Sequence, residues 1–288
     1  MLSLLAVLVL SAVKPIACAH AHNDYAHDRP LTEALENGFC SVEADIFLVD
    51  GALLVGHNQA DLKPERTLES LYLDPLAKTV REHGGSVYGD GTVVTLLVDV
   101  KGDAETTATQ LRQVLPKYKD MLVTLRKRTG VQIIISGNRP KVDPGLAGSE
   151  FLFIDGRLSD LVADPRPQMP FISDNFESNF TWRGQGNMSA DERMKLETIV
   201  KRTHAHKQKI RFWAIPDNEA GWSAMLDAGV DYVNTDHLAE FRKFYETRTG
   251  TFNLLWKRFE SRSSVLRDMR EPSLSVCLSS TPAPKLVP

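Results

Sequence analysis

Side chains that could perform acid–base and metal chemistry are concentrated in three short stretches of this sequence. The first, HAHNDY, contains His20 and His22, and histidine is the side chain that gains and loses a proton near neutral pH. The second, SVEADIF, has Glu43 and Asp45 two positions apart, and His57 follows in GALLVGHN. Residues i and i+2 of a strand point to the same face, so we expect these two carboxylates to act together.

The third stretch, LLVDVKGD, repeats this spacing with Asp99 and Lys101. If its strand lies beside the strand of Glu43 and Asp45, three carboxylates converge. Unit charges 4 Å apart repel by roughly 1 kcal/mol in water and about 4 kcal/mol at a protein-like dielectric, so such a group must bind a cation or hold protons. Because oxygen ligands favour Mg²⁺ or Ca²⁺ over Zn²⁺, we predict one divalent cation, Mg²⁺ or Ca²⁺, held by Glu43, Asp45 and Asp99.

Basic side chains beside a hard cation are typical of a site for a phosphate group. Lys101 and Arg139, the latter in IIISGNRP, are predicted to contact that phosphate. His22 and His57 are predicted to be the general acid and base, and each such group is typically worth about 10²–10⁴ in rate. His20 is expected to orient or line the site.

Short apolar runs that alternate with amphipathic stretches must position these residues. Strands are expected over 16–20, 41–48, 95–100, 132–136, 151–155, 170–174, 211–215 and 231–235. Helices are expected over 67–82, 105–118, 190–207 and 218–228. Eight strands alternating with helices favour an α/β fold of the (β/α)₈ TIM-barrel type, in which chemistry occurs at the C-terminal ends of the strands. A hairpin is expected over 87–92, and GALLVGHN is expected to be a loop.

Four segments together resemble the PLC-like phosphodiesterase superfamily: HAHNDY, the Pro30-Leu31 pair, SVEADIFLVDGALLVGH and RTLESLYLDPL. Within it, they are most similar to the altered-inheritance-of-mitochondria family and its exported bacterial relatives. The superfamily includes glycerophosphodiester phosphodiesterases and phosphatidylinositol phospholipases C. The resemblance covers roughly residues 18–240 and implies a (β/α)₈ barrel that cleaves phosphodiesters at a single divalent cation.

The resemblance also implies roles for individual residues. It implies the same histidine pair, carboxylate ligands and lysine as the spacing argument: His22, His57, Glu43, Asp45, Asp99 and Lys101. It adds Trp213 as an aromatic substrate contact on the seventh strand and Asn23 as a further candidate ligand. Asp99 stands where glycerophosphodiesterases commonly carry Glu. The expected function is metal-dependent hydrolysis of glycerophosphodiesters or (lyso)phospholipids. Sphingomyelin is disfavoured as a substrate, because no Cys closely follows His57, and the disulfide-bearing loop of the superfamily's spider-venom phospholipases D is therefore missing.

Two other functions remain open. A metal-dependent amidohydrolase could use His20-Ala21-His22 as its metal motif and Asp236 as its base. That chemistry also needs histidines at the ends of the fifth and sixth strands, where this chain has Asp155 and Asp174. The second alternative is a barrel that binds a ligand without catalysis.

The two ends of the chain differ from its middle. Residues 1–12 predict a signal peptide, cleaved between 12 and 19, and hence export to the periplasm, the cell surface or the medium. We expect the barrel over 13–248, and a C-terminal helix with a loose Pro/Ser-rich tail over 249–288. Residues 241–271 carry more basic than acidic side chains. This basic helix is expected to pack on the barrel, with contact to a membrane surface as the alternative. The net charge of −3 among 288 residues argues against nucleic acid as a partner.

Overall fold

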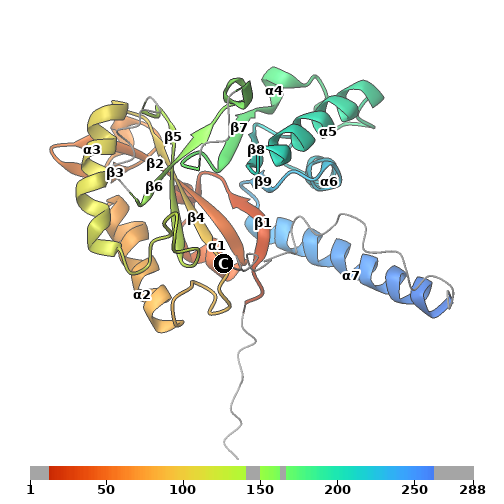
Figure 1. Cartoon of the computed structure of the whole chain (residues 1–288), viewed down its shortest axis with the longest axis horizontal. Helices are drawn as coiled ribbons and strands as arrows, with labels where there is room; N and C mark the ends of the chain where they lie inside the picture. Colours follow the sequence, from red (N-terminus) through yellow and green to blue (C-terminus); the bar gives the residue numbers. More distant parts are fainter. Residues whose placement is uncertain (1–12, 141–149, 163–166, 263–288) are drawn as a thin grey trace, which may run out of the picture.

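The expected strands close into a ring. A computed structural model describes residues 13–140, 150–162 and 167–262, with side chains up to residue 250 apart from residue 162. Eight parallel strands follow one another in the order β1-β9-β8-β7-β6-β5-β4-β2, and pairing between β1 and β2 completes the circle (Figure 1). The predicted (β/α)₈ barrel is therefore confirmed. The predicted signal peptide and the Pro/Ser-rich tail lie outside the described residues.

Both ends of every predicted strand lie within two residues of the ends of an observed strand. The strands of the ring are β1 (Ile16–Ala21), β2 (Phe39–Val49), β4 (Val94–Val100), β5 (Val131–Gly137), β6 (Leu152–Gly156), β7 (Phe171–Asn175), β8 (Lys209–Trp213) and β9 (Tyr232–Thr235). Their outward side chains are covered by helices and their inward side chains fill the barrel, which is why parallel strands read as nearly continuous apolar runs.

The interior of the barrel has an apolar half and a polar half. Inward residues alternate along each strand, and on several strands an apolar one precedes a polar one by two positions, as Leu97 precedes Asp99 and Phe153 precedes Asp155. The apolar floor consists of Leu97, Val123, Ile134, Phe153, Phe171 and Tyr232. Above it, towards the C-terminal ends of the strands, the polar layer consists of His20, Ser41, Glu43, Ser136, Asp155, Ser173, Arg211 and Asn234, all buried.

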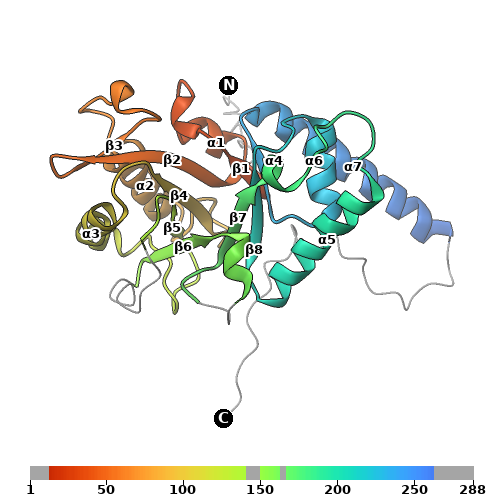
Figure 2. The same ribbon diagram turned by 90° about the horizontal axis from the view of Figure 1, so that it is seen from above.

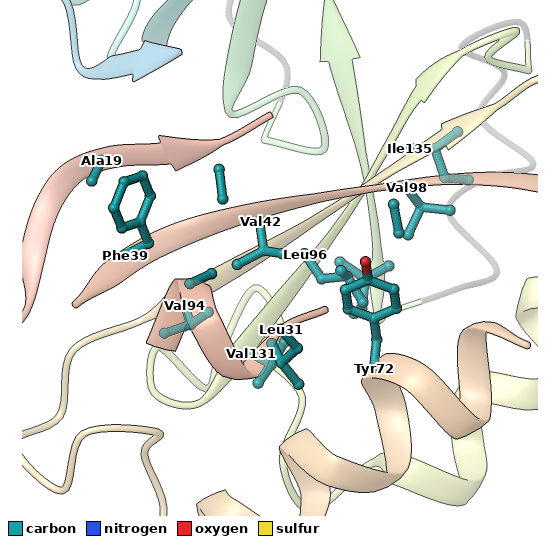
Figure 3. Packing of buried hydrophobic residues seen from close by; sticks show 14 of the residues in the cluster. Ala19, Leu31, Phe39, Val42, Tyr72, Val94, Leu96, Val98, Val131 and Ile135 are labelled. Carbon is teal, nitrogen blue, oxygen red and sulfur yellow. The ribbon is translucent and has the colours of Figure 1, made fainter. Parts of the chain in front are cut away.

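Helices flank the ring on two sides. The helices are α1 (Thr32–Glu36), α2 (Asp74–Glu82), α3 (Ala104–Val114), α4 (Phe176–Asn179), α5 (Ala190–Ala205), α6 (Glu219–Ala228) and α7 (Leu238–Arg262). Figure 2 shows α2 and α3 on one side of the ring and α5, α6 and α7 on the other. A π-helical turn, η3 (Glu69–Leu73), precedes α2 and carries Tyr72, which packs among strand residues such as Val42 and Leu96 (Figure 3). None of the helices in the described ranges is both long enough and apolar enough to cross a membrane.

The expected hairpin is at a different place. The prediction over 87–92 is wrong, because those residues form turns without strands. The hairpin instead joins β2 to β3 (Ala52–Val55), so the expectation of a loop for GALLVGHN is also wrong. Asp50 and Gly51 both have positive φ, +48° and +81°, as a two-residue turn of type I′ requires.

The last described helix begins against the barrel. Phe241 is buried and its ring packs on those of Phe39 and Trp222, which ties the start of α7 to β2 and α6. The helix continues unbroken to Arg262, so the domain boundary expected at residue 249 falls inside it. Most of the aromatic and basic side chains expected to contact the barrel or a membrane lie beyond the described side chains.

Candidate active site

Three carboxylates meet at the C-terminal ends of β2 and β4. Parallel pairing puts Asp45 directly opposite Asp99, and Glu43 lies two positions before Asp45 on the same face. One oxygen atom from each of Glu43, Asp45 and Asp99 lies within 4.8 Å of the others. The structure therefore brings together the three residues that the sequence predicts as ligands.

One oxygen of this acidic group is well suited to a cation. Asp45 is fully buried, and its Oδ1 atom has no hydrogen-bond partner within the described part of the chain. A buried carboxylate oxygen without a partner is costly, so such atoms ordinarily face a donor or a metal. The set of oxygen ligands fits a hard divalent cation such as Mg²⁺ or Ca²⁺.

The other oxygen of Asp45 is crowded with donors. Its Oδ2 atom lies 2.9 Å from His57 Nδ1, 3.1 Å from Lys101 Nζ and 2.7 Å from the Tyr25 hydroxyl. Lys101 also reaches Asp99 Oδ1 at 3.0 Å. Burial, together with the nearby charge of Glu43, raises the pKa of Asp99 above its ordinary value. Added positive charge is therefore favourable here.

A glycine makes room for Asp99. Gly137, at the end of β5, has φ +65°, and a Cβ atom built on it would lie 2.2 Å from Asp99 Oδ1. It would also lie 2.6 Å from the carbonyl oxygen of Val100. The SGN stretch of the sequence therefore needs glycine for two reasons, its left-handed backbone and the close approach of the carboxylate.

His22 faces a carboxylate from the last strand end. Its Nδ1 atom lies 2.8 Å from Asp236 Oδ1, and the Asn23 amide lies 3.0 Å from the same nitrogen. Burial alone would lower the pKa of His22, but the hydrogen bond to Asp236 and the charge of Glu43 outweigh it, so the pKa is raised. Because Asp236 engages Nδ1, Nε2 is the nitrogen left to exchange protons.

His20 belongs to a buried network that the sequence indicated only in part. His20 Nε2 lies 3.1 Å from Glu43 Oε2 and 2.7 Å from Arg211 Nη1, while Nδ1 lies 2.7 Å from Ser41 Oγ. Burial and the charge of Arg211 lower the pKa of His20 to about 4, so it is neutral at pH 7. We expected His20 to orient or line the site, and its burial beside Glu43 agrees with that expectation.

Arg211 is a residue that the sequence analysis missed. Its Nη1 atom lies 2.8 Å from Glu43 Oε2. The hydrogen bond with His20 and then the charge of Arg211 hold the pKa of the Glu43 carboxyl well below its usual range, although burial opposes the shift. The position of Arg211 two residues before Trp213 was the available signal, since both must share the inward face of β8. The guanidinium beside His20 also leaves no room for the metal that an amidohydrolase would bind there.

Tyr25 is the second residue that the sequence analysis undervalued. Its hydroxyl lies 2.8 Å from Asn23 Oδ1 and 3.2 Å from His57 Nδ1, in addition to its contact with Asp45. Burial and the hydrogen bond to Asp45 raise the pKa of Tyr25 far above its ordinary value, so the phenol keeps its proton. The HNDY stretch thus links β1 to the acidic group.

The remaining predicted substrate contacts lie further round the ring. The Arg157 guanidinium lies 5.0 Å from the centre of the Trp213 ring, and that of Arg211 lies 5.9 Å away. Arg139 Nη1 is held by the Asp155 carbonyl and by Asp160 Oδ2, each at 2.8 Å. Trp213 is therefore connected to the acidic group through Arg211, whereas Arg139 is engaged at the end of β6.

Comparison with known proteins agrees with this geometry. Residues 8–136 match the AIM6-like phosphodiesterase domain, and residues 209–239 match the glycerophosphoryl diester phosphodiesterase family. The resemblance predicted from the sequence is confirmed. Both matched families are phosphodiesterases, which supports a function of the phosphodiesterase type. The two stretches contain the main groups of the site: His22, Glu43, Asp45, His57, Asp99, Arg211, Trp213 and Asp236.

Relatives with similar sequences are found in fungi. The altered inheritance of mitochondria protein 6 homolog of Arthroderma benhamiae is 28% identical over 277 residues, which cover 82% of this chain and 86% of that protein. Altered inheritance of mitochondria protein 6 of Eremothecium gossypii is 29% identical, covering 78% and 68% respectively. Among solved structures, a glycerophosphodiester phosphodiesterase from Agrobacterium tumefaciens aligns with 12% identity and a TM-score of 0.44, over 81% of this chain and 97% of that one.

Proposed function

We propose that this protein is a divalent-cation-dependent phosphodiester hydrolase that acts on glycerophosphodiesters or (lyso)phospholipids. The observation that carries the proposal is that the two carboxylate oxygens of Asp45 have different surroundings. Its buried Oδ1 atom has no partner in the described part of the chain, while Oδ2 contacts His57 and Lys101. One carboxylate thereby joins a cation site to an acid–base histidine and a phosphate-binding lysine.

Glu43, Asp45 and Asp99 would hold the cation. When bound, it supplies positive charge that offsets the charge developing on the phosphoryl oxygens. Lys101 Nζ, 3.0 Å from Asp99 and partly exposed, would donate to a non-bridging oxygen of the substrate. The acidic group would otherwise repel an anionic phosphate, so Lys101 also makes the approach of substrate favourable.

The two histidines would divide the proton transfers. Asp236 fixes Nδ1 of His22 and stabilises its imidazolium form, as the carboxylate of a hydrolase triad does, so we assign His22 as the base. His22 Nε2 takes a proton from the nucleophile, which is either a water molecule or an adjacent hydroxyl group of the substrate. As the new O–P bond forms, the bond to the leaving oxygen breaks, and His57 Nε2 protonates that oxygen.

The surroundings of His57 suggest where the substrate lies. An open hollow of about 700 Å³ adjoins His57 and is bordered by Tyr25, His27, Lys63 and Arg66. Its walls combine the basic Lys63 and Arg66 with apolar side chains and with the acidic Asp28 and Asp61. Lys63 and Arg66 could attract a phosphate, and the apolar part suits its alcohol or lipid substituent. We propose that Trp213, across the barrel mouth, contacts the other substituent of the phosphate. Arg139 would approach the substrate only by releasing Asp160.

Export remains part of the proposal. We propose that a leader is removed before Ile16, because β1 begins there and pairs with both β2 and β9. A cut after residue 17 or 19, within the range expected from the sequence, would remove part of a strand that closes the barrel. Contact of the C-terminal helix with a membrane surface is a further proposal, which would suit a lipid substrate.

Phosphorus NMR tests the proposed reaction. The purified protein is incubated with glycerophosphodiesters and lysophospholipids, with Mg²⁺ or Ca²⁺ and then with chelator. We expect new phosphomonoester or cyclic-phosphate signals that disappear with chelator, and a loss of about 10²–10⁴ in rate for His22→Ala or His57→Ala. His206→Ala, at the end of α5, is the matched control and should retain activity. Turnover that persists in both site variants would refute the assignment.

A further inference from the structure

The hydroxyl of Tyr25 lies at the centre of the site and is held there rigidly. The side chain is only 7% exposed, and the backbone carbonyl of Tyr25 accepts a hydrogen bond from Arg66 Nη2 at 2.6 Å. The hydroxyl contacts groups from three segments: Asn23 from the loop after β1, Asp45 from β2, and His57 from the loop after β3. These contacts and the burial of the ring together restrain the phenol.

This hydroxyl helps to saturate one oxygen of Asp45. An ionised carboxylate oxygen has about two lone-pair directions. Asp45 Oδ2 already receives three donors, from Tyr25, His57 and Lys101, at 2.7, 2.9 and 3.1 Å. Oδ1 is buried and has no such partner among the described residues. Asp45 can therefore offer a cation one oxygen but not both.

The three donors differ in how firmly they are held. The side chain of His57 is 61% exposed and that of Lys101 is 27% exposed, so both can turn towards a substrate or solvent. Tyr25 has no such freedom. It is the most buried of the three donors, and therefore the one best placed to stay on Oδ2 when a substrate binds.

The number of oxygens offered matters for the choice of cation. Mg²⁺ requires nearly octahedral coordination at short distances and takes carboxylates through one oxygen, whereas Ca²⁺ accepts six to eight ligands and readily takes both oxygens of a carboxylate. We propose that Tyr25 is a specificity-determining residue that makes this a Mg²⁺ site by holding Asp45 to single-oxygen coordination. The inference rests on the proposed function, because it assumes that the acidic group binds a cation.

Tyr25→Phe isolates the hydroxyl. The substitution retains the ring and its packing and leaves Oδ2 with only His57 and Lys101, the two donors that can turn away, so a cation can also reach this second oxygen of Asp45. Ca²⁺ should gain affinity and Mg²⁺ should not. We expect the ratio of the Mg²⁺ Kd to the Ca²⁺ Kd to rise about tenfold, which is the usual scale of one hydrogen bond to a charged group.

Tyr72→Phe is the matched control. Its hydroxyl donates to Asp24 Oδ2 at 2.9 Å, so this variant also removes a buried phenol bonded to a carboxylate of the HNDY loop, but not to a predicted ligand. Calorimetric titration of Mg²⁺ and of Ca²⁺ into the metal-free full chain, with a circular dichroism spectrum of each variant, makes the comparison. A ratio that shifts in Tyr25→Phe alone supports the inference.

Three results would overturn it: an unchanged ratio in Tyr25→Phe, an equal shift in Tyr72→Phe, or a wild-type protein that binds Ca²⁺ more tightly than Mg²⁺. The last measurement needs no variant, so it can overturn the inference even if Tyr25→Phe fails to fold. A wild-type protein that binds neither cation would instead remove the proposed function, and with it this inference.

Discussion

Gly137→Ala is predicted to damage the cation site selectively. The added Cβ would lie 2.2 Å from Asp99 Oδ1, whereas ordinary contacts of this kind begin near 3.4 Å. The carboxylate must therefore retreat by about 1 Å, several times the ~0.2 Å tolerance of a metal–ligand distance. The Val100 carbonyl, 2.6 Å from the same Cβ, cannot retreat without disturbing β4. Asp99 should accordingly be lost as a ligand.

The same substitution has a backbone cost that must be separated from this effect. Alanine at φ +65° costs about 1–2 kcal/mol in the free energy of unfolding. Gly186 offers the control, because its φ is +62° and a Cβ there would meet nothing within 4 Å. Gly186→Ala should therefore lower the melting temperature by a few degrees without touching the site.

Titration calorimetry with Mg²⁺ and thermal melts of both variants provide the assay. We expect cation affinity to fall by about 10–100-fold in Gly137→Ala, the scale seen when the support of a metal ligand is disturbed, and to stay at the wild-type level in Gly186→Ala. Equal affinities in the two variants would refute the argument, and would indicate that Asp99 does not ligate the cation.

Two predictions concern pH. The pKa of His22 is raised above 6.5, so if the neutral form is the base, kcat/KM should rise with pH with a midpoint above that value. Asp236→Asn removes the partner that raises this pKa, and the midpoint should move to lower pH. An unmoved midpoint contradicts the pairing. Burial raises the pKa of Asp24 from 3.8 to about 6, so the folded state holds this proton more tightly. Stability due to Asp24 should be full below pH 3.8 and fall by up to about 3 kcal/mol as pH rises to about 6. Melts of wild type and Asp24→Asn across pH 3–8 test this, and a constant difference between them contradicts it.

The ring and its acidic group could be predicted because both depend on local spacing. Buried parallel strands are apolar on both faces, so their positions are readable without knowledge of their partners. The i, i+2 rule then puts Glu43 with Asp45, and pairing of neighbouring strands adds Asp99. These inferences need no contact between distant parts of the chain beyond the pairing of two strands.

The missed residues depend on distant contacts. Arg211 meets Glu43 across 168 positions of sequence, and whether an inward arginine reaches that carboxylate depends on the closed ring. Tyr25 reaches Asp45 only because the η1 turn (Asp24–Ala26) folds back over the end of β2. The place of the hairpin depends on a local signal, because Asp50-Gly51 is a stronger two-residue turn sequence than the glycine-rich stretch at 87–92.

The β2–β3 hairpin fixes the separation of two proposed partners along one piece of chain. The paired stretch runs from Ile46 and Val55 to Val49 and Ala52. Asp45 comes directly before it and His57 two residues after it, 2.9 Å from Asp45. A single inserted residue would slip the register and turn one strand's side chains to the opposite face, whereas a matched pair, one on each strand, would lengthen the arm and preserve their facing. In homologues that retain the contact between these two residues, the length of the β2–β3 hairpin should therefore change in steps of two residues, unless a β-bulge accommodates a single extra residue.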